Sequence, residues 1–267
     1  MSLDHSNTVL LVTGGTRGIG LATALAYARY GAKAILTYRW GTADEAQIRQ
    51  AFRDVGGPEP WLVEADVANK EETDSLAARI AERYGKVDVF VSNASMALLV
   101  KSLDDYSERG LYQRFRASAW PTFEYLLALR KHTTRFPRHA IIMSSDGPDR
   151  YTNAYDFVAA SKAVLETLMR YVQFRVREEP VNINVIRSRA IRTESFDSTF
   201  GGEFYGFLRR FVDDEWFMTC NEVAEAALAL GSGFFDAVRG QVITVDRGAT
   251  FSDGISHLYS EREKRGL

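Results

Sequence analysis

The sequence has too little cysteine and histidine to support a disulfide framework or a zinc site. Its 267 residues include one cysteine, Cys220, and four scattered histidines. A single cysteine cannot close an internal disulfide, and a Cys/His zinc site needs several such ligands held close together. We therefore expect neither a disulfide nor a metal, and the cysteine content fits a reducing compartment such as the cytoplasm.

An excess of charge and a long apolar run are also missing. Lys and Arg number 33 against 35 Asp and Glu, a net charge of −2, so no basic surface for nucleic acid or acidic lipid is expected. No apolar run approaches the roughly 18 residues of a membrane-spanning helix. The polar residues before the first apolar run are not typical of a signal peptide. These features predict a cytoplasmic protein with no nucleic-acid or membrane partner.

Apolar runs of strand length alternate along the chain with amphipathic stretches of helix length. This alternation, with almost wholly apolar strands, predicts a parallel sheet covered by helices on both faces. No repeat or linker divides the chain, so residues 1–267 are expected to form one doubly wound, Rossmann-like α/β domain. The expected strands are 8–13, 33–38, 61–64, 87–91, 140–143, 181–186 and 241–245, and the main helices are 18–30, 42–55, 71–84, 108–132, 155–177 and 221–230.

Two segments interrupt this alternation. Residues 193–214 are rich in Phe, Gly and acidic residues, which suggests a small helical flap over a substrate site. Within it Phe204, Phe207 and Phe211 share one helical face, which favours packing in the core over a wall for an apolar substrate. Residues 250–267 form a C-terminal extension ending in a charge run, which predicts a solvated or frayed end rather than a lid.

A glycine-rich turn follows the first expected strand and opens the first expected helix. It reads Thr-Gly-Gly-Thr-Arg-Gly-Ile-Gly over residues 13–20. Gly14 permits a tight turn, Gly18 lets the backbone approach a pyrophosphate, and Gly20 allows close contact of helix and strand. The N–H groups and the positive dipole end of the helix favour bound phosphate. The turn therefore predicts a dinucleotide site, the alternative being a purely structural glycine turn.

The Gly-x-x-x-Gly-x-Gly spacing resembles the short-chain dehydrogenase/reductase family, and the resemblance extends from about residue 8 to 246. Further matches are Asp66 after the third strand, Asn93 after the fourth, and the segments 240–241 and 245–248 near the end of the sheet. The resemblance implies a nicotinamide cofactor and often a tetramer formed through the two long helices. The residues it implies for cofactor contact are Gly14, Thr16, Arg17, Gly18, Ile19, Gly20, Arg39, Asp66, Val67, Asn93, Lys162, Ile191 and Thr193.

The second strand ends without the carboxylate that would bind the adenosine ribose and repel a 2′-phosphate. Arg39 stands there instead and can offer a planar fork to that phosphate, joined by Arg17 from the glycine turn. We therefore expect NADPH as the cofactor. The alternative is that Arg39 is a solvated surface arginine.

The spacing of tyrosine and lysine departs from most of this family, which has a tyrosine four residues before the lysine. Here that place is Val158, whereas Tyr155 lies seven residues before Lys162. Seven residues make two helical turns, about 10.5 Å, and return to nearly the same face. This Tyr-x6-Lys spacing resembles the enoyl-acyl carrier protein reductases, and most closely type III, which keep a ketoreductase-like body.

That resemblance implies hydride transfer to the β-carbon of a 2-enoyl thioester. The phenol of Tyr155 would stabilise the enolate oxygen. Lys162 would favour ionisation of the phenol by its charge and hold the nicotinamide ribose. Ser145, ten residues before Tyr155, is expected to give a second hydrogen bond to the same oxygen, the alternative being a cap at the strand end.

Other positions depart from the family pattern. An Asn of the family's catalytic set falls at about Arg116, and Ser95 replaces a Gly. Arg187, Arg189 and Arg192 follow the sixth strand, where they would hold anionic groups or pair with acids such as Glu194. The residues expected at the substrate are Tyr151, as an aromatic wall or a substitute phenol, Ser95 and Arg189.

Three functions remain open at this stage. The first is an NADPH-dependent reductase of an enoyl thioester, carried by acyl carrier protein or by CoA, and the missing Asn favours it. The second is a ketoreductase of polyketide or other secondary metabolism. The third is a catalytically silent nucleotide-binding subunit, which the changes at Val158, Arg116 and Ser188 would allow.

Overall fold

The computed structural model describes residues 3–39, 43–96, 99–189, 191, 193, 196 and 201–266. Seven parallel strands form one sheet in the order β3-β2-β1-β4-β5-β6-β7. This confirms the predicted doubly wound domain and all seven strand positions to within one or two residues. The strands are β1 Val9–Val12, β2 Lys33–Tyr38, β3 Trp61–Glu64, β4 Val89–Ser92, β5 His139–Ser145, β6 Asn182–Ser188 and β7 Val242–Val245.

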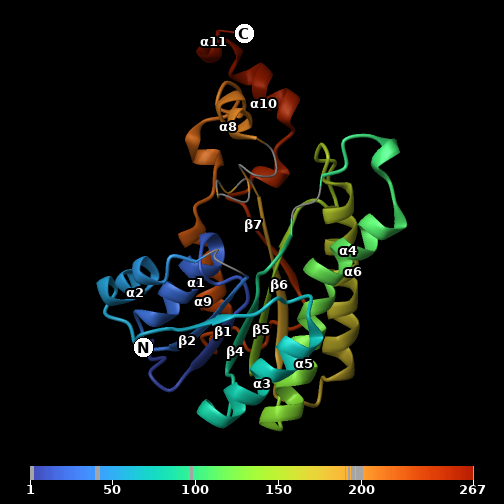
Figure 1. The fold of residues 1–267 in the computed structure, drawn as a ribbon. Coiled ribbons are helices and arrows are strands. Elements are labelled where there is room, and N and C mark those ends of the chain that lie inside the picture. Colours follow the sequence, from blue (N-terminus) through green and yellow to red (C-terminus); the bar gives the residue numbers. More distant parts are fainter. Residues whose placement is uncertain are drawn as a thin grey trace.

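Helices cover both faces of the sheet (Figure 1). Each layer encloses its own apolar core, one containing Tyr27 and Phe52 and the other containing Phe90 and Tyr125, whose rings stack at 5.5 Å. None of the helices in the described ranges is long and apolar enough to cross a membrane. One face carries α1 Gly18–Ala28, α2 Glu45–Asp54 and α9 Cys220–Leu230, and the other carries α3 Lys70–Tyr84, α4 Glu108–Ser118, α5 Trp120–Thr133 and α6 Asp156–Arg175.

The order of the strands reverses between β1 and β4, which are neighbours in the sheet but not in the chain. Ligands of such folds bind outside the carboxyl ends of the strands at this switch point. The glycine turn after β1 and the segment after β4 both begin there. The fold therefore places the glycine turn and Asn93 at the switch point of the sheet.

The helix expected over residues 108–132 is divided into α4 and α5. Ala119, at the break, has φ −117° and ψ −57°, and Pro121 lies in the first turn of α5. Proline has no N–H to donate to the preceding turn, and its ring clashes with it, so one continuous helix cannot form. As a result α4 packs on α6 while α5 packs on α3.

The flap and the C-terminal extension pack together beyond the carboxyl edge of the sheet (Figure 1). Lys264 Nζ lies 2.9 Å from Asp213 Oδ2, and the rings of Trp216 and His257 lie 4.8 Å apart. Of the two expectations for this end, a solvated end agrees with the absence of buried residues in the last two helices of the described chain. A frayed end does not fit residues up to 266, because Asp213 of the flap pairs with the basic tail. The short helices here are α8 Gly202–Leu208, η2 Asp214–Trp216, η3 Ala249–Phe251, α10 Gly254–Ser260 and α11 Arg262–Arg265, and η1 Leu103–Asp105 precedes α4.

Core packing was the wrong interpretation of the aromatic residues in the flap. No side chain of α8 is buried. The rings pack in pairs instead, Phe207 with Phe211 at 5.0 Å and Phe196 with Phe204 at 5.9 Å. The flap thus presents part of its aromatic surface to solvent, and its role towards substrate stays a prediction.

Candidate active site

The glycine turn has the backbone that its sequence predicts. Gly14 and Gly18 have φ of +60° and +54°, in the left-handed region that favours glycine. A Cβ on Gly20 would lie 2.5 Å from the carbonyl oxygen of Gly14. A Cβ on Gly18 would lie 3.7 Å from Thr193. Thr193, which the resemblance implies for cofactor contact, therefore lies next to the glycine turn. Gly14, Gly18 and Gly20 therefore leave a cradle of exposed backbone. A side chain at any of them would fill the space that a bound pyrophosphate needs.

Asn93 holds the turn in place from the end of β4. Its amide Nδ2 donates to the carbonyl oxygens of Thr13 and Gly14, at 3.1 and 2.9 Å. The backbone N–H groups of Asn93 and Ala94 donate to Thr13 Oγ1, and the N–H of Gly14 donates to Thr37 Oγ1. The side-chain amide of Asn93 therefore acts on the turn itself, while a direct contact with cofactor stays a prediction.

Two residues predicted at the adenosine end meet in an ion pair. Arg39 Nε lies 3.2 Å from Asp66 Oδ2, and both side chains are partly exposed. Arg39 is thus paired rather than merely solvated. Partly exposed pairs of this kind contribute little to stability, so the guanidinium can turn to a phosphate at low cost. Val67, beside Asp66, packs against the core instead.

Tyr155 directly precedes α6 and lies beside the end of β5. Its phenol makes a side-chain hydrogen bond with Ser145. Burial raises the pKa of Tyr155, while the Ser145 bond and the charge of Arg114 lower that pKa and Asp146 raises it. Ser145 Oγ also accepts the N–H of Gly147 at 3.4 Å, as a cap at the strand end would, while its hydrogen bond to the substrate oxygen stays a prediction.

Lys162 lies two turns into the same helix and is 6% exposed. Its Nζ donates to the carbonyl oxygen of Met143 at 2.7 Å. Burial lowers the pKa of Lys162 to about 8, against the opposing effect of the nearby Glu166 carboxylate. Lys162 is therefore an ammonium at neutral pH, anchored to β5. The charge of Arg114 also acts on the Tyr155 phenol and lowers its pKa, while the predicted effect of Lys162 on that phenol stays a prediction.

Two arginines of α4 differ in their surroundings, and the sequence analysis named only Arg116, as the place where the family has an Asn. Arg116 is exposed and donates to the carbonyl oxygen of Ala68 at 2.8 Å, away from Tyr155. Arg114 is fully buried and interacts by charge with both Tyr155 and Lys162. Gly110, Arg114 and Ser118 recur every four residues on one face, but this spacing alone does not show that the face is buried.

The arginines after β6 are paired with acids. Arg187 Nε lies 2.9 Å from Glu166 Oε1, and its guanidinium also pairs with Asp149. Arg189 Nε lies 3.4 Å from Asp146 Oδ2. The interpretation as paired arginines is therefore confirmed for these two, although their partners come from β5–α6 and from α6. Arg192 and the acid proposed to face it, Glu194, lie outside the described residues.

The remaining predicted residues are not gathered beside Tyr155. Tyr151 is 86% exposed and its hydroxyl donates to Asn153 Oδ1, so the structure does not bring it to the site as a wall or substitute phenol. Ser95 Oγ donates to Ser118 Oγ at 3.1 Å. The side chain of Ile191 is buried, which leaves only its backbone for a cofactor.

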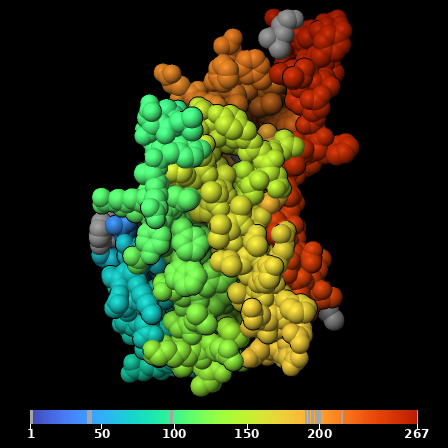
Figure 2. All heavy atoms as spheres, turned by 90° about the vertical axis from the view of Figure 1, so that its right-hand side faces the viewer, coloured from blue at the N-terminus to red at the C-terminus, as the bar shows by residue number. Residues whose placement is uncertain are grey.

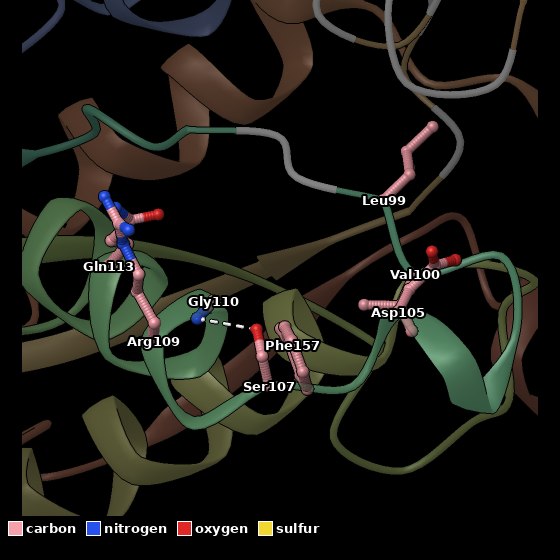
Figure 3. Close-up of a pocket in the computed structure, with 8 residues that line it drawn as sticks. All are labelled: Leu99, Val100, Asp105, Ser107, Arg109, Gly110, Gln113 and Phe157. Carbon is pink, nitrogen blue, oxygen red and sulfur yellow. Dashed lines mark hydrogen bonds between the residues drawn. The ribbon is translucent and has the colours of Figure 1, made fainter.

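A hollow of about 300 Å³ lies beside the start of α6 (Figure 3). Phe157, two residues after Tyr155, forms part of its wall. Ser107 Oγ accepts the N–H of Gly110 at 3.1 Å and so caps α4 at the edge of the hollow (Figure 3). Sequence reasoning named none of its lining residues, which are Leu99, Val100, Asp105, Ser107, Arg109, Gly110, Gln113 and Phe157.

Comparison with known proteins gives consistent similarities. The family model described as enoyl-(acyl carrier protein) reductase matches residues 14–250. A 1-cyclohexenylcarbonyl-CoA reductase of Streptomyces collinus is 29% identical over 247 residues, 90% of this chain and 86% of that protein. Versicolorin reductase 1 of Aspergillus parasiticus is 25% identical over 263 residues, 93% of this chain and 99% of that protein. A crystal structure of a short chain dehydrogenase from Burkholderia cenocepacia in complex with NADP has a TM-score of 0.80 at 22% identity, covering 93% of this chain and 99% of that one.

Proposed function

Because this chain belongs to the short-chain dehydrogenase/reductase family, we propose that it is an NADPH-dependent reductase of a 2-enoyl thioester of CoA or acyl carrier protein. The observation that carries this is the position of Tyr155. It makes a hydrogen bond with Ser145 at the carboxyl end of the sheet, while Val158 occupies the usual tyrosine place. The Streptomyces relative, whose name specifies a CoA thioester, supports the same substrate class.

The mechanism follows from the two hydroxyl groups. NADPH, when bound, supplies the hydride that reaches the β-carbon. The hydroxyls of Tyr155 and Ser145 would then donate to the thioester oxygen as it becomes negative, and the buried setting strengthens both hydrogen bonds. Lys162, anchored by Met143, would present its ammonium to the ribose of the cofactor.

The preference for NADPH over NADH rests on Arg39. Its guanidinium would leave Asp66 and bind the 2′-phosphate as a planar fork. We expect Arg39→Ser to raise the KM for NADPH about tenfold or more and to leave the KM for NADH nearly unchanged. A variant with equal losses for both cofactors would argue against this role.

The reaction is tested by following NADPH absorbance with crotonyl-CoA and acetoacetyl-CoA as substrates. Oxidation with crotonyl-CoA is expected, and Tyr155→Phe should lower kcat/KM about a hundredfold or more, as loss of an acid–base group does. Tyr151→Phe is the matched control and should retain activity, because that phenol is exposed. Oxidation of NADPH with the keto substrate alone would exclude the enoyl assignment.

A ketoreductase is the second candidate, and the versicolorin reductase relative favours it. Such an enzyme would use the same Tyr155–Ser145 pair to donate to a ketone oxygen. The two-substrate assay separates the candidates directly.

We further propose that the protein assembles as a homo-oligomer, a dimer or tetramer, through the face formed by α4, α5 and α6. Figure 2 shows these helices side by side on one broad surface. Large apolar side chains on it are exposed: Tyr112 on α4, Leu127 on α5, and Tyr171 and Phe174 on α6. Light scattering should give a multiple of 30.0 kDa, and Phe174→Glu should shift it towards the monomer. A monomer in the unmodified protein would reject this assembly.

A further inference from the structure

Arg114 is a buried charge that has no hydrogen-bond partner among the described residues. Its side chain has 0% exposure, and Nε, Nη1 and Nη2 all lack a hydrogen-bond partner. Burial lowers the pKa of Arg114 to about 10, so the guanidinium is still charged at neutral pH. A buried charge with no partner opposes folding strongly. This cost would be offset by an anion that forms beside Arg114 during the reaction.

The packing of α4 shows where the guanidinium is directed. One turn before Arg114, a Cβ on Gly110 would lie 3.1 Å from Phe157 in the first turn of α6. One turn after it, Ser118 Oγ accepts the N–H of Met96, beyond the end of β4. Arg114 lies between these contacts on the same helical face. It therefore points between the start of α6 and the end of β4, where Tyr155 begins α6.

Among the charged groups near the Tyr155 phenol, Arg114 is the cation that acts on it. Asp146, after β5, acts against ionisation of Tyr155, and Ser145 donates to it. Lys162 is engaged by the Met143 carbonyl and lies near the Glu166 carboxylate. Glu166 in turn is shared by Ser144 and Arg187. Arg114 interacts by charge with Tyr155, and no acidic residue of the described ranges is paired with it.

We propose that Arg114 is a positioning residue that supplies the countercharge for the Tyr155 phenolate. When the phenol gives its proton to the substrate, the O–H electron pair stays on the phenol oxygen, and the negative charge faces the guanidinium. A proton taken up from bulk solvent then restores the phenol, so that one solvent proton is consumed for each substrate reduced. The inference deepens the proposed function, because it assigns to Arg114 the charge effect expected from Lys162.

The titration of Tyr155 tests this without any substrate. The full-length protein is labelled with tyrosine carrying ¹³C at Cζ, and the resonance lost in Tyr155→Phe identifies the residue. An opposite charge within a few ångströms shifts a pKa by about one unit or more. In Arg114→Met the midpoint of Tyr155 should therefore rise by about one pH unit or more, and Arg114→Lys should restore most of this shift. Arg109→Met, an exposed arginine on the same helix, is the matched control and should change nothing.

The outcomes are distinct from those of the activity assay. An unchanged Tyr155 midpoint in folded Arg114→Met overturns the proposal. Arg114→Met should also raise the melting temperature, because an unpaired buried charge is replaced by an apolar chain of similar length. If that variant does not fold, Arg114→Lys and Arg114→Gln are compared in the same titration. Failure of crotonyl-CoA reduction alone leaves the titration result standing and counts only against the substrate assignment.

Discussion

Gly147 lies directly against the ring of Tyr155, which makes it a sensitive point of the site. A Cβ there would stand 2.9 Å from both Cδ1 and Cε1 of the ring and 3.1 Å from the Cβ of Ala159. These distances are too short for carbon contacts, so the ring of Tyr155 would have to move. The position of the phenol thus depends on the absence of one methyl group.

We expect Gly147→Ala to lower kcat/KM about tenfold or more, because displacing a reacting group by about 1 Å is costly. The melting temperature should change little, since Tyr155 lies at the end of a helix and can shift without opening the core. Gly206→Ala, where a Cβ meets nothing within 4 Å, is the matched control. Wild-type activity in Gly147→Ala would show that the ring position is not critical.

The lowered pKa of Lys162 should make the stability of the protein depend on pH. Burial lowers the pKa of Lys162 from 10.5 to about 8, so the unfolded chain binds more protons than the folded one between these values. The contribution of Lys162 to the unfolding free energy therefore rises with pH across this interval, and below about pH 8 the full cost of burying its charge remains.

Denaturant unfolding at about pH 7 and pH 10 measures this contribution, with Lys162→Met as the reference for all other groups. We expect the difference in unfolding free energy between wild type and Lys162→Met to move in favour of wild type at the higher pH. Catalysis should show the opposite trend and decline above about pH 8, since the ammonium is lost. A constant difference between the two proteins would mean that the pKa of Lys162 is not depressed.

At the scale of a single element, α4 matters because it carries both the edge of the hollow and Arg114. Ser107 caps it by accepting the N–H of Gly110. Ser107→Ala should lower the unfolding free energy by about 1 kcal/mol, the usual cost of losing such a cap. Ser107→Asp should retain stability, because aspartate caps equally well. Equal stability of all three proteins in denaturant would show that the cap is unimportant.

The break between α4 and α5 also belongs to this scale. The 3.6-residue pattern runs through it, and only Pro121 indicates an interruption. By ending α4 at Ser118, the break frees that hydroxyl to contact Ser95 and Met96. Two short helices can therefore serve different partners where one long helix could not.

In the whole molecule, the C-terminal extension and the flap form one unit around Asp213. Its Oδ2 lies 2.9 Å from Lys264 Nζ and 3.2 Å from Arg265 Nη2. Asp213→Lys should therefore increase hydrogen exchange in α10 and α11, and a second change, Lys264→Asp, should restore part of the protection. Asp104→Lys, an exposed acid on η1, is the control. Unaltered exchange in Asp213→Lys would mean that apolar contacts alone hold the tail.

Much of the site could be predicted because its signals are local. The positive φ values at Gly14 and Gly18 follow from the turn, and Tyr155 and Ser145 lie near the ends of adjoining elements. Arg114 could not be chosen over Arg116 in the same way. Both arginines are on one helix, and only its packing against α6 decides which of them is buried.

The sequence by itself determined the order of strands and helices and the glycine turn, because periodicity and backbone preference act over a few residues. Tertiary structure decided which charges find partners. Arg187 and Arg189 reach acids on other elements, the basic tail reaches Asp213, and Arg114 finds no hydrogen-bond partner in the described part of the chain. Charge pairing depends on distances through space between residues far apart in the chain, and those distances exist only once the helices have packed on the sheet.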